Sequence, residues 1–99
     1  GDEKEYAFAG VAVQDLDRDT AKELGLKGKT QGVVVTSVEP ESGADKAGLM
    51  PGDVIREINR QPVKSVKEFE KVSSGVKKGE NVLILINRRG ASLFLSAKV

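Results

Sequence analysis

The 99-residue sequence contains neither histidine nor cysteine, and these two absences remove most of the side chains on which enzyme chemistry depends. Ser-His-Asp and Cys-His mechanisms both need an imidazole that takes up the proton of the nucleophile. Disulfide frameworks and zinc sites lose their usual ligands as well. Serine and lysine are common, but no motif groups them into a serine–lysine hydrolase site. We therefore expect no catalytic residue, no metal and no cofactor in this chain.

An excess of charge of one sign and a long apolar run are also lacking. Lys and Arg number 16 against 15 Asp and Glu, a net charge of +1, whereas a nucleic-acid surface needs a clustered excess of basic residues. No apolar run approaches the roughly 18 residues of a membrane span, and the first residues lack the apolar segment of a signal peptide. We expect no nucleic-acid partner and no membrane insertion. The chain is then either cytosolic or cut from a longer precursor.

The distribution of apolar residues predicts one α+β domain of about five strands and two or three short helices. Residues 1–5 are polar and are expected to be disordered or artificially appended, so that residues 6–99 form the domain. A loop running into a strand is expected over Tyr6–Gln14. Further strands are predicted at Val33–Val38, Val54–Ile58, Val82–Asn87 and Ala91–Ala97.

Helix start and stop signals predict the helices. They cover Thr20–Leu24 before Gly25, Ser42–Ala47 before Gly48, and Val66 to about Ser74 after the cap residue Ser65.

Three aspartates, Asp15, Asp17 and Asp19, imitate the start of a calcium loop. Thr20 and Leu26, however, occupy the positions where that loop needs glycine and glutamate. We therefore interpret Asp17 or Asp19 as a helix cap.

Two basic pairs, Lys77-Lys78 and Arg88-Arg89, lie at predicted turns. They are interpreted as solvated turn residues rather than an anion site.

The segment Gly32–Val63 closely resembles PDZ domains, most specifically in Ala47–Ile55, which reads AGLMPGDVI. The last strand follows the helix–strand unit, an order similar to the permuted bacterial PDZ domains of HtrA/Do serine proteases. The resemblance covers Tyr6–Val99 and implies a partly open β-barrel or sandwich of five to six strands. One departure is Gly43, where that group often has proline; we expect it to affect only helix initiation.

The resemblance implies a peptide-binding site at Phe8–Val11, which matches the aromatic-Φ-Gly-Φ loop of the family, where Φ is apolar. Such domains add the C-terminus of a peptide as a strand at a sheet edge and hold its carboxylate with backbone N–H groups. By resemblance, those N–H groups belong to Ala9, Gly10 and Val11. In the following strand, alternation would direct Val11 and Val13 toward the pocket and Ala12 and Gln14 away.

The helix that begins at Val66 is expected to form the opposite wall of this groove. Helical spacing places Val66, Glu70 and Ser73 on one face. The neighbouring face, with Phe69, Val72 and Val76, is more apolar and is assigned to the core. A rotation by one residue would exchange Ser73 for Val72. Val66 stands where many animal PDZ domains have a histidine that selects Ser or Thr in the ligand, which implies preference for apolar residues near the ligand C-terminus.

The resemblance therefore implies a peptide-recognition domain of a periplasmic or cell-envelope HtrA/Do-like serine endopeptidase active in protein quality control. Its partners would be protein C-termini with apolar last residues and an attached protease domain. One alternative is a module that mainly assembles protease subunits. Another is the PDZ domain of a site-2 or C-terminal processing protease.

Overall fold

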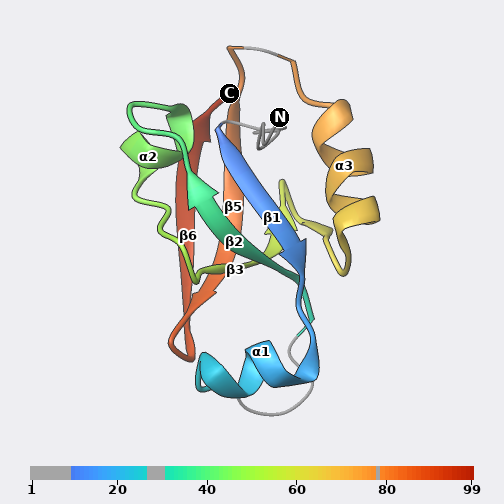
Figure 1. Ribbon diagram of the computed structural model, residues 1–99. Coiled ribbons are helices and arrows are strands. Elements are labelled where there is room, and N and C mark those ends of the chain that lie inside the picture. The colour runs from blue at the N-terminus through green and yellow to red at the C-terminus, as the bar shows by residue number, and fades with distance from the viewer. Residues whose placement is uncertain (1–9, 27–30, 78) are drawn as a thin grey trace, which may run out of the picture.

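Six strands and three short helices are found in the part of the chain that the computed structural model describes, residues 10–26, 31–77 and 79–99 (Figure 1). In chain order they are β1 (Val11–Asp15), α1 (Arg18–Glu23), β2 (Val33–Val38), α2 (Gly43–Ala47), β3 (Val54–Ile58), β4 (Gln61–Pro62), α3 (Val66–Ser74), β5 (Asn81–Arg88) and β6 (Ala91–Lys98). The predicted strands from Val33 onward and the three predicted helices are thus confirmed to within two residues at their ends.

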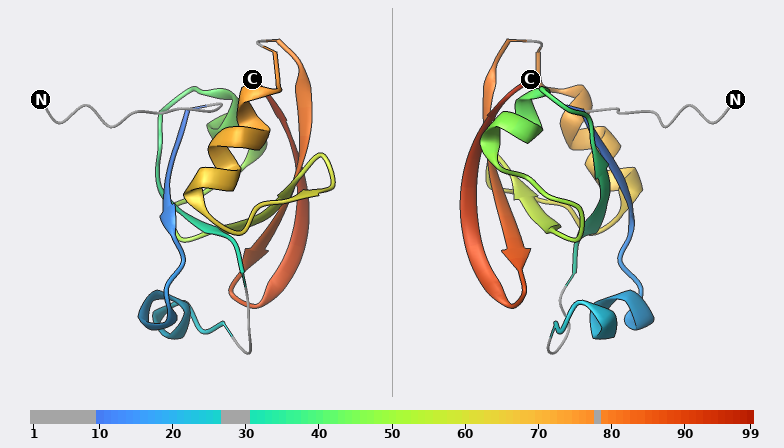
Figure 2. Two further views of the ribbon diagram at one scale, coloured as in Figure 1. Left: turned by 90° about the vertical axis from the view of Figure 1, so that its right-hand side faces the viewer. Right: turned by 60° about the vertical axis from the view of Figure 1, so that its left-hand side comes forward.

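All strands belong to one open antiparallel sheet with the order β1-β2-β3-β5-β6, and the short β4 pairs with β3. β1 and β6 are therefore the two edges of the sheet. The helix α2 lies beside β6, whereas α3 lies on the other side of the fold, between β1 and the β3–β4 turn (Figures 1 and 2). In the described ranges, no helix is long and apolar enough to cross a membrane.

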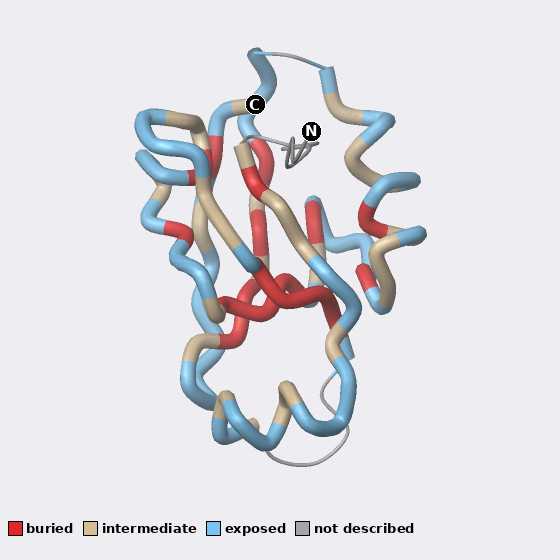
Figure 3. The backbone as a smooth tube through the Cα atoms, in the orientation of Figure 1, coloured by how far each residue is buried: buried red, intermediate tan, exposed pale blue. Residues whose placement is uncertain are grey.

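The core fills the concave side of this sheet and is made almost entirely of branched aliphatic side chains. The buried stretches of the central strands meet in the middle of the molecule (Figure 3). Phe69 of α3 is 1 % exposed and is the largest buried side chain. Its burial contributes about 1.5–3 kcal/mol and fixes which side of α3 faces inward. Around it lie Val11, Val33, Val35, Ile55, Ile58, Val63, Val82, Ile84 and Ile86.

An ion pair between a buried aspartate just before β3 and a partly exposed arginine joins this point to the end of β5. Asp53 is 2 % exposed, and Arg88 donates from Nε to its Oδ1 (2.9 Å) and from Nη2 to its Oδ2 (2.8 Å). Arg88 Nη2 also donates to the carbonyl of Gly48 at 2.8 Å, and the Met50 N–H donates to Asp53 Oδ2 at 2.9 Å. The hydrogen bond to Asp53 raises the pKa of Arg88. The interpretation of Arg88 as a solvated turn residue is therefore wrong, because Arg88 holds the loop that precedes β3.

Gly43, the first residue of α2, allows this helix to approach β6 very closely. A Cβ atom added at Gly43 would overlap the backbone carbonyl oxygen of Lys98. The helix itself is capped at its start by Ser42, whose Oγ accepts from the Asp45 N–H at 3.2 Å, and at its end by Gly48 with φ 97°. The expectation that Gly43 affects only helix initiation is thus wrong, because its missing side chain also sets the distance between α2 and β6.

Replacing Asp53 by Asn should lower the free energy of unfolding by about 1–3 kcal/mol, because Arg88 loses a charged bidentate acceptor in a mostly buried position. Urea unfolding followed by circular dichroism measures this change. Asp19→Asn, at an exposed position in α1, is the matched control and should change stability by less than about 0.5 kcal/mol. Equal effects of the two substitutions would contradict the role given to Asp53.

Replacing Gly43 by Ala gives a second test, because helix propensity predicts a gain in stability and packing predicts a loss. Alanine favours helix by up to about 1 kcal/mol over glycine. The overlap with Lys98 should outweigh this gain and destabilise the protein by about 1–3 kcal/mol. The urea midpoint of Gly43→Ala should therefore fall, while that of Lys46→Ala, an exposed change in the same helix, should stay nearly constant. A rise for Gly43→Ala would show that α2 and β6 are not in close contact.

Candidate functional site

The edge strand β1 leaves one row of backbone groups pointing away from the sheet. The Glu39 N–H donates to the Gly10 carbonyl at 2.8 Å, so the carbonyl of Gly10 faces β2. Backbone direction alternates along a strand. The N–H and C=O groups of Val11, Val13 and Asp15 therefore face away from β2, toward the side on which α3 lies (Figure 2). This side of β1 can accept another extended chain.

Gly10, directly before β1, is required as glycine for two reasons. Its φ of 85° lies in the left-handed region that side chains disfavour. A Cβ atom at this position would also overlap the side chain of Ser42, the cap of α2. The backbone before β1 can therefore turn closely over the start of α2. Of the predicted carboxylate loop, the structure places Gly10 and Val11 at the start of β1, whereas Phe8 and Ala9 lie outside the described residues.

A hydrogen bond to a carboxylate joins the start of α3 to the far end of β1. Asp15 Oδ1 accepts from the N–H of Val66, the first residue of α3, at 2.8 Å. Ser65 caps the same turn, because its Oγ accepts from the Glu68 N–H at 3.2 Å. A carboxylate at a helix N-terminus is favoured by the helix dipole. Asp15 thus fixes α3 against β1. The sequence does not predict this role, because the partner of Asp15 lies 51 residues away and no local pattern indicates it.

The two flanks of α3 carry different residues, since Phe69 turns inward and successive residues advance by about 100°. Val66, whose N–H donates to Asp15 of β1, shares one flank with Glu70 and Ser73 by helical spacing. Val72 lies on the opposite flank, where it lines a cavity beside the β3–β4 turn. Val66 and Ser73 are half-buried and Glu70 is exposed.

The side chains of β1 contribute unequally to the space beside α3. Val11 is only 1 % exposed and packs in the core, so what it presents outward is its backbone. Val13 and Ala12 are half-buried, and Gln14 is exposed. A bulge interrupts the pairing with β2 between Ala12 and Val13, and the Thr36 hydroxyl donates to the Ala12 carbonyl at 3.1 Å. β1 therefore presents backbone at Val11 and a half-buried apolar side chain at Val13.

The aspartates that imitate a calcium loop are used for helix starts. Asp17 Oδ1 accepts from the Thr20 N–H at 2.7 Å, and the hydrogen bonds from the backbone and side chain of Thr20 lower the pKa of Asp17. Asp17, rather than Asp19, is the cap of α1. Asp15 points to α3 instead. Among the described residues, no group of three or more acidic side chains is placed to hold a metal ion.

Comparisons with known proteins agree with this geometry. The family model described as "PDZ domain" matches residues 8–99. A protein of Chlamydia muridarum named "Probable periplasmic serine endoprotease DegP-like" is 43 % identical over 89 residues, which are 90 % of this chain and 18 % of that protein. A protein of the same name from Pseudomonas putida is 36 % identical over 99 residues, 100 % of this chain and 20 % of that protein. The chain thus spans about a fifth of the length of these relatives.

Solved structures show the same fold. The structure described as "HtrA-type protease AlgW with decapeptide" matches with a TM-score of 0.82 and 33 % identity, over 92 % of this chain and 28 % of that one. The HtrA3 PDZ domain bound to a phage-derived ligand matches with a TM-score of 0.75 and 21 % identity, over 92 % and 82 % of the two chains. The expected PDZ fold is therefore confirmed, as an open sheet of six described strands with three short helices. This chain belongs to the PDZ domain family, and its similarity is to DegP-like and HtrA-type serine proteases.

Proposed function

We propose that this domain captures polypeptide C-termini by adding them as a strand to β1, in the groove between β1 and α3. The observation that carries the proposal is the free edge of β1. This strand follows Gly10, whose φ is 85°, and its far end is hydrogen-bonded to the start of α3. Strand addition at such an edge is a known mode of peptide recognition. The decapeptide in the similar HtrA-type protease structure supports peptide as the ligand class.

The chemistry proposed for the carboxylate is backbone hydrogen bonding from the segment Phe8–Val11. A nest of successive N–H groups binds an anion without a basic side chain. Each such bond to a charged acceptor contributes roughly 1.5–3 kcal/mol. One apolar side chain of the ligand would pack beside Val13 and Val66, adding about 1.5–3 kcal/mol. After the cost of association, an affinity on the order of micromolar is expected.

In this proposal the parent protein is a serine endopeptidase of the periplasm, and the domain presents substrates to it or regulates it. Support comes from the names of the relatives, which are periplasmic serine endoproteases, and from their much greater length. Catalysis would then belong to a part of the parent outside this chain, in agreement with the absence of histidine here.

A titration monitored by backbone amide resonances tests the capture of a C-terminus. A peptide that ends in valine with a free carboxylate should shift the amides of Val11–Asp15. The same peptide with an amidated C-terminus should bind at least about tenfold more weakly, because the charge-assisted hydrogen bonds are lost. Equal binding of the two peptides would contradict carboxylate capture. No binding of either would favour a module that only assembles protease subunits.

Truncation of the two flanking valines of α3 tests which side of the helix holds the ligand. Val66 and Val72 are both half-buried and pack against the core, but they lie on opposite flanks. Val66→Ala should weaken binding of the valine-ending peptide about threefold to tenfold, through lost apolar contact. Val72→Ala should cost similar stability and leave that affinity within about twofold. The reverse pattern, measured by calorimetry, would place the ligand on the other flank. Substitution of Gly10 is a poorer test, because a side chain there overlaps Ser42 and would disturb the fold itself.

A further inference from the structure

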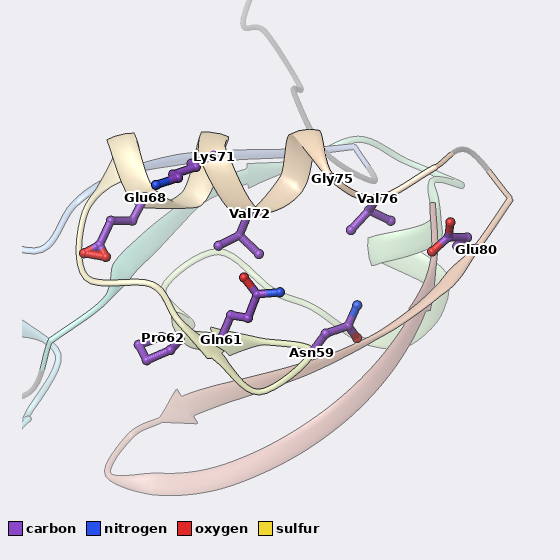
Figure 4. A pocket seen from close by; sticks show the side chains of 9 residues that line it. All are labelled: Asn59, Gln61, Pro62, Glu68, Lys71, Val72, Gly75, Val76 and Glu80. Carbon is purple, nitrogen blue, oxygen red and sulfur yellow. The ribbon is translucent and has the colours of Figure 1, made fainter.

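A cavity of about 530 Å³ lies behind α3, on the flank that faces away from β1. It separates α3 from the β3–β4 turn (Figure 4). Val72 of α3 and Val76, which follows the helix, point down, and Asn59 and Gln61 point up from the β3–β4 connection toward them (Figure 4). Binding sites for small ligands and short peptide segments have volumes of about 300–1,000 Å³. The cavity is thus large enough for a ligand and is distinct from the proposed groove for C-termini.

The floor of this cavity carries amide groups held by a rigid turn. Asn59 and Arg60 have φ values of 50° and 68°, which make the tight connection between β3 and β4. Asn59 Oδ1 accepts from the Leu83 N–H at 2.9 Å, and the Asn59 N–H donates to the Leu83 carbonyl at 2.7 Å. The Oδ1 bond orients the side-chain amide, so that its Nδ2 can donate into the cavity. The side-chain amides of Asn59 and Gln61 can together form hydrogen bonds with the C=O and N–H groups of a polypeptide backbone.

The two ends of the cavity are acidic. Glu68, in the first turn of α3, lies at one end, and Glu80 lies at the other (Figure 4). Glu80 is held in place, because its Oε1 accepts from the Lys77 N–H at 3.3 Å. Lys71, which lies on the side of Glu68 in Figure 4, is the single basic residue of the lining, so the two carboxylates outnumber its one ammonium group. Basic groups at both ends of a ligand would complement this distribution.

Between the acidic ends, the roof is apolar. Val72 and Val76 are half-buried, and Gly75 between them leaves the helix surface without a side chain. Pro62 adds an apolar surface from the side of the turn. One aliphatic side chain can pack in this middle section, where each buried CH₂ contributes about 0.8 kcal/mol.

We propose that this cavity is a second binding site, which takes an extended polypeptide segment with one apolar side chain between two lysine or arginine residues. It goes beyond the proposed capture of C-termini, since neither a free carboxylate nor the edge of β1 takes part. The two sites lie on opposite flanks of α3, so a chain bound in one leaves the other open. The domain would hold an unfolded polypeptide at an internal basic segment as well as at its end.

The probe for this site is the pentapeptide acetyl-Ser-Lys-Val-Lys-Ser-amide, whose blocked ends cannot use the carboxylate loop. In a titration of the whole chain followed by amide resonances, we expect shifts at Asn59, Gln61, Gly75 and Val76, with little change over Val11–Gln14. Acetyl-Ser-Glu-Val-Glu-Ser-amide, which has the opposite charges, should produce at least about fivefold smaller shifts at the same concentration.

A second test removes the negative charges at the two ends of the cavity by substitution. Glu68→Gln with Glu80→Gln should weaken binding of the lysine peptide about threefold to tenfold, since exposed ion pairs contribute modestly. The matched control, Glu23→Gln with Glu41→Gln, removes the same charge from exposed positions elsewhere and should leave the affinity unchanged. The amide spectrum of each variant shows whether it is folded.

Three results would overturn the proposal. They are shifts of the lysine peptide confined to β1, equal binding of the lysine and glutamate peptides, and equal loss of affinity in the two double variants. The outcome is separable from that of the proposed function. Peptides with blocked ends report only on the cavity, and peptides with a free C-terminal valine report on β1.

Discussion

The buried carboxylate of Asp53 is the constraint on which the remaining arrangement depends. Its side chain binds Arg88 of β5 and the Met50 N–H, while its backbone carbonyl accepts from the Val35 N–H of β2 at 2.8 Å. One residue therefore joins two strands of the sheet to the loop that leaves α2. Arg88 extends the connection to the C-cap of α2 at Gly48. At its other end, α2 begins at Ser42, which lies against Gly10. The ion pair thus positions α2, and α2 in turn positions the backbone before β1.

Much of the fold could be predicted from the sequence because its signals are local. The β-branched run Val33–Val38, the cap residue Ser65 and the turn at Gly48 each act within a few residues, and each lies where the pattern placed it. The contacts that failed prediction join distant residues. No local pattern predicts the role of Arg88, because its partner Asp53 lies 35 positions earlier, and the tight packing of Gly43 depends on Lys98, 55 positions later. The candidate site divides in the same way. The flank of α3 that carries Val66 follows from helical spacing. The hydrogen bond between Asp15 and Val66 and the acidic cavity can be found only in the tertiary structure.

α3 has a larger part in this domain than its nine residues suggest. Phe69 alone anchors it deeply in the core, and its start is fixed by Ser65 and Asp15. Both remaining flanks are left available, one beside the edge of β1 and one beside the β3–β4 turn (Figure 2). A helix attached along one narrow stripe can in this way separate the two proposed binding surfaces without belonging entirely to either.

The placement of α3 beside β1 also limits how many strands can be added to this edge of the sheet. An exposed sheet edge normally invites further strands and, with them, aggregation. A strand added to β1 would have its own outer edge against a helix, whose backbone hydrogen bonds are already made internally. In the proposed mode of binding, addition would therefore stop after one strand. At the opposite end of the sheet, the close contact of α2 with Lys98 covers part of β6. In the proposed mode of binding, the edge of β1 thus takes a single polypeptide chain, and α3 blocks at this edge the continuous strand pairing from which fibrils are built.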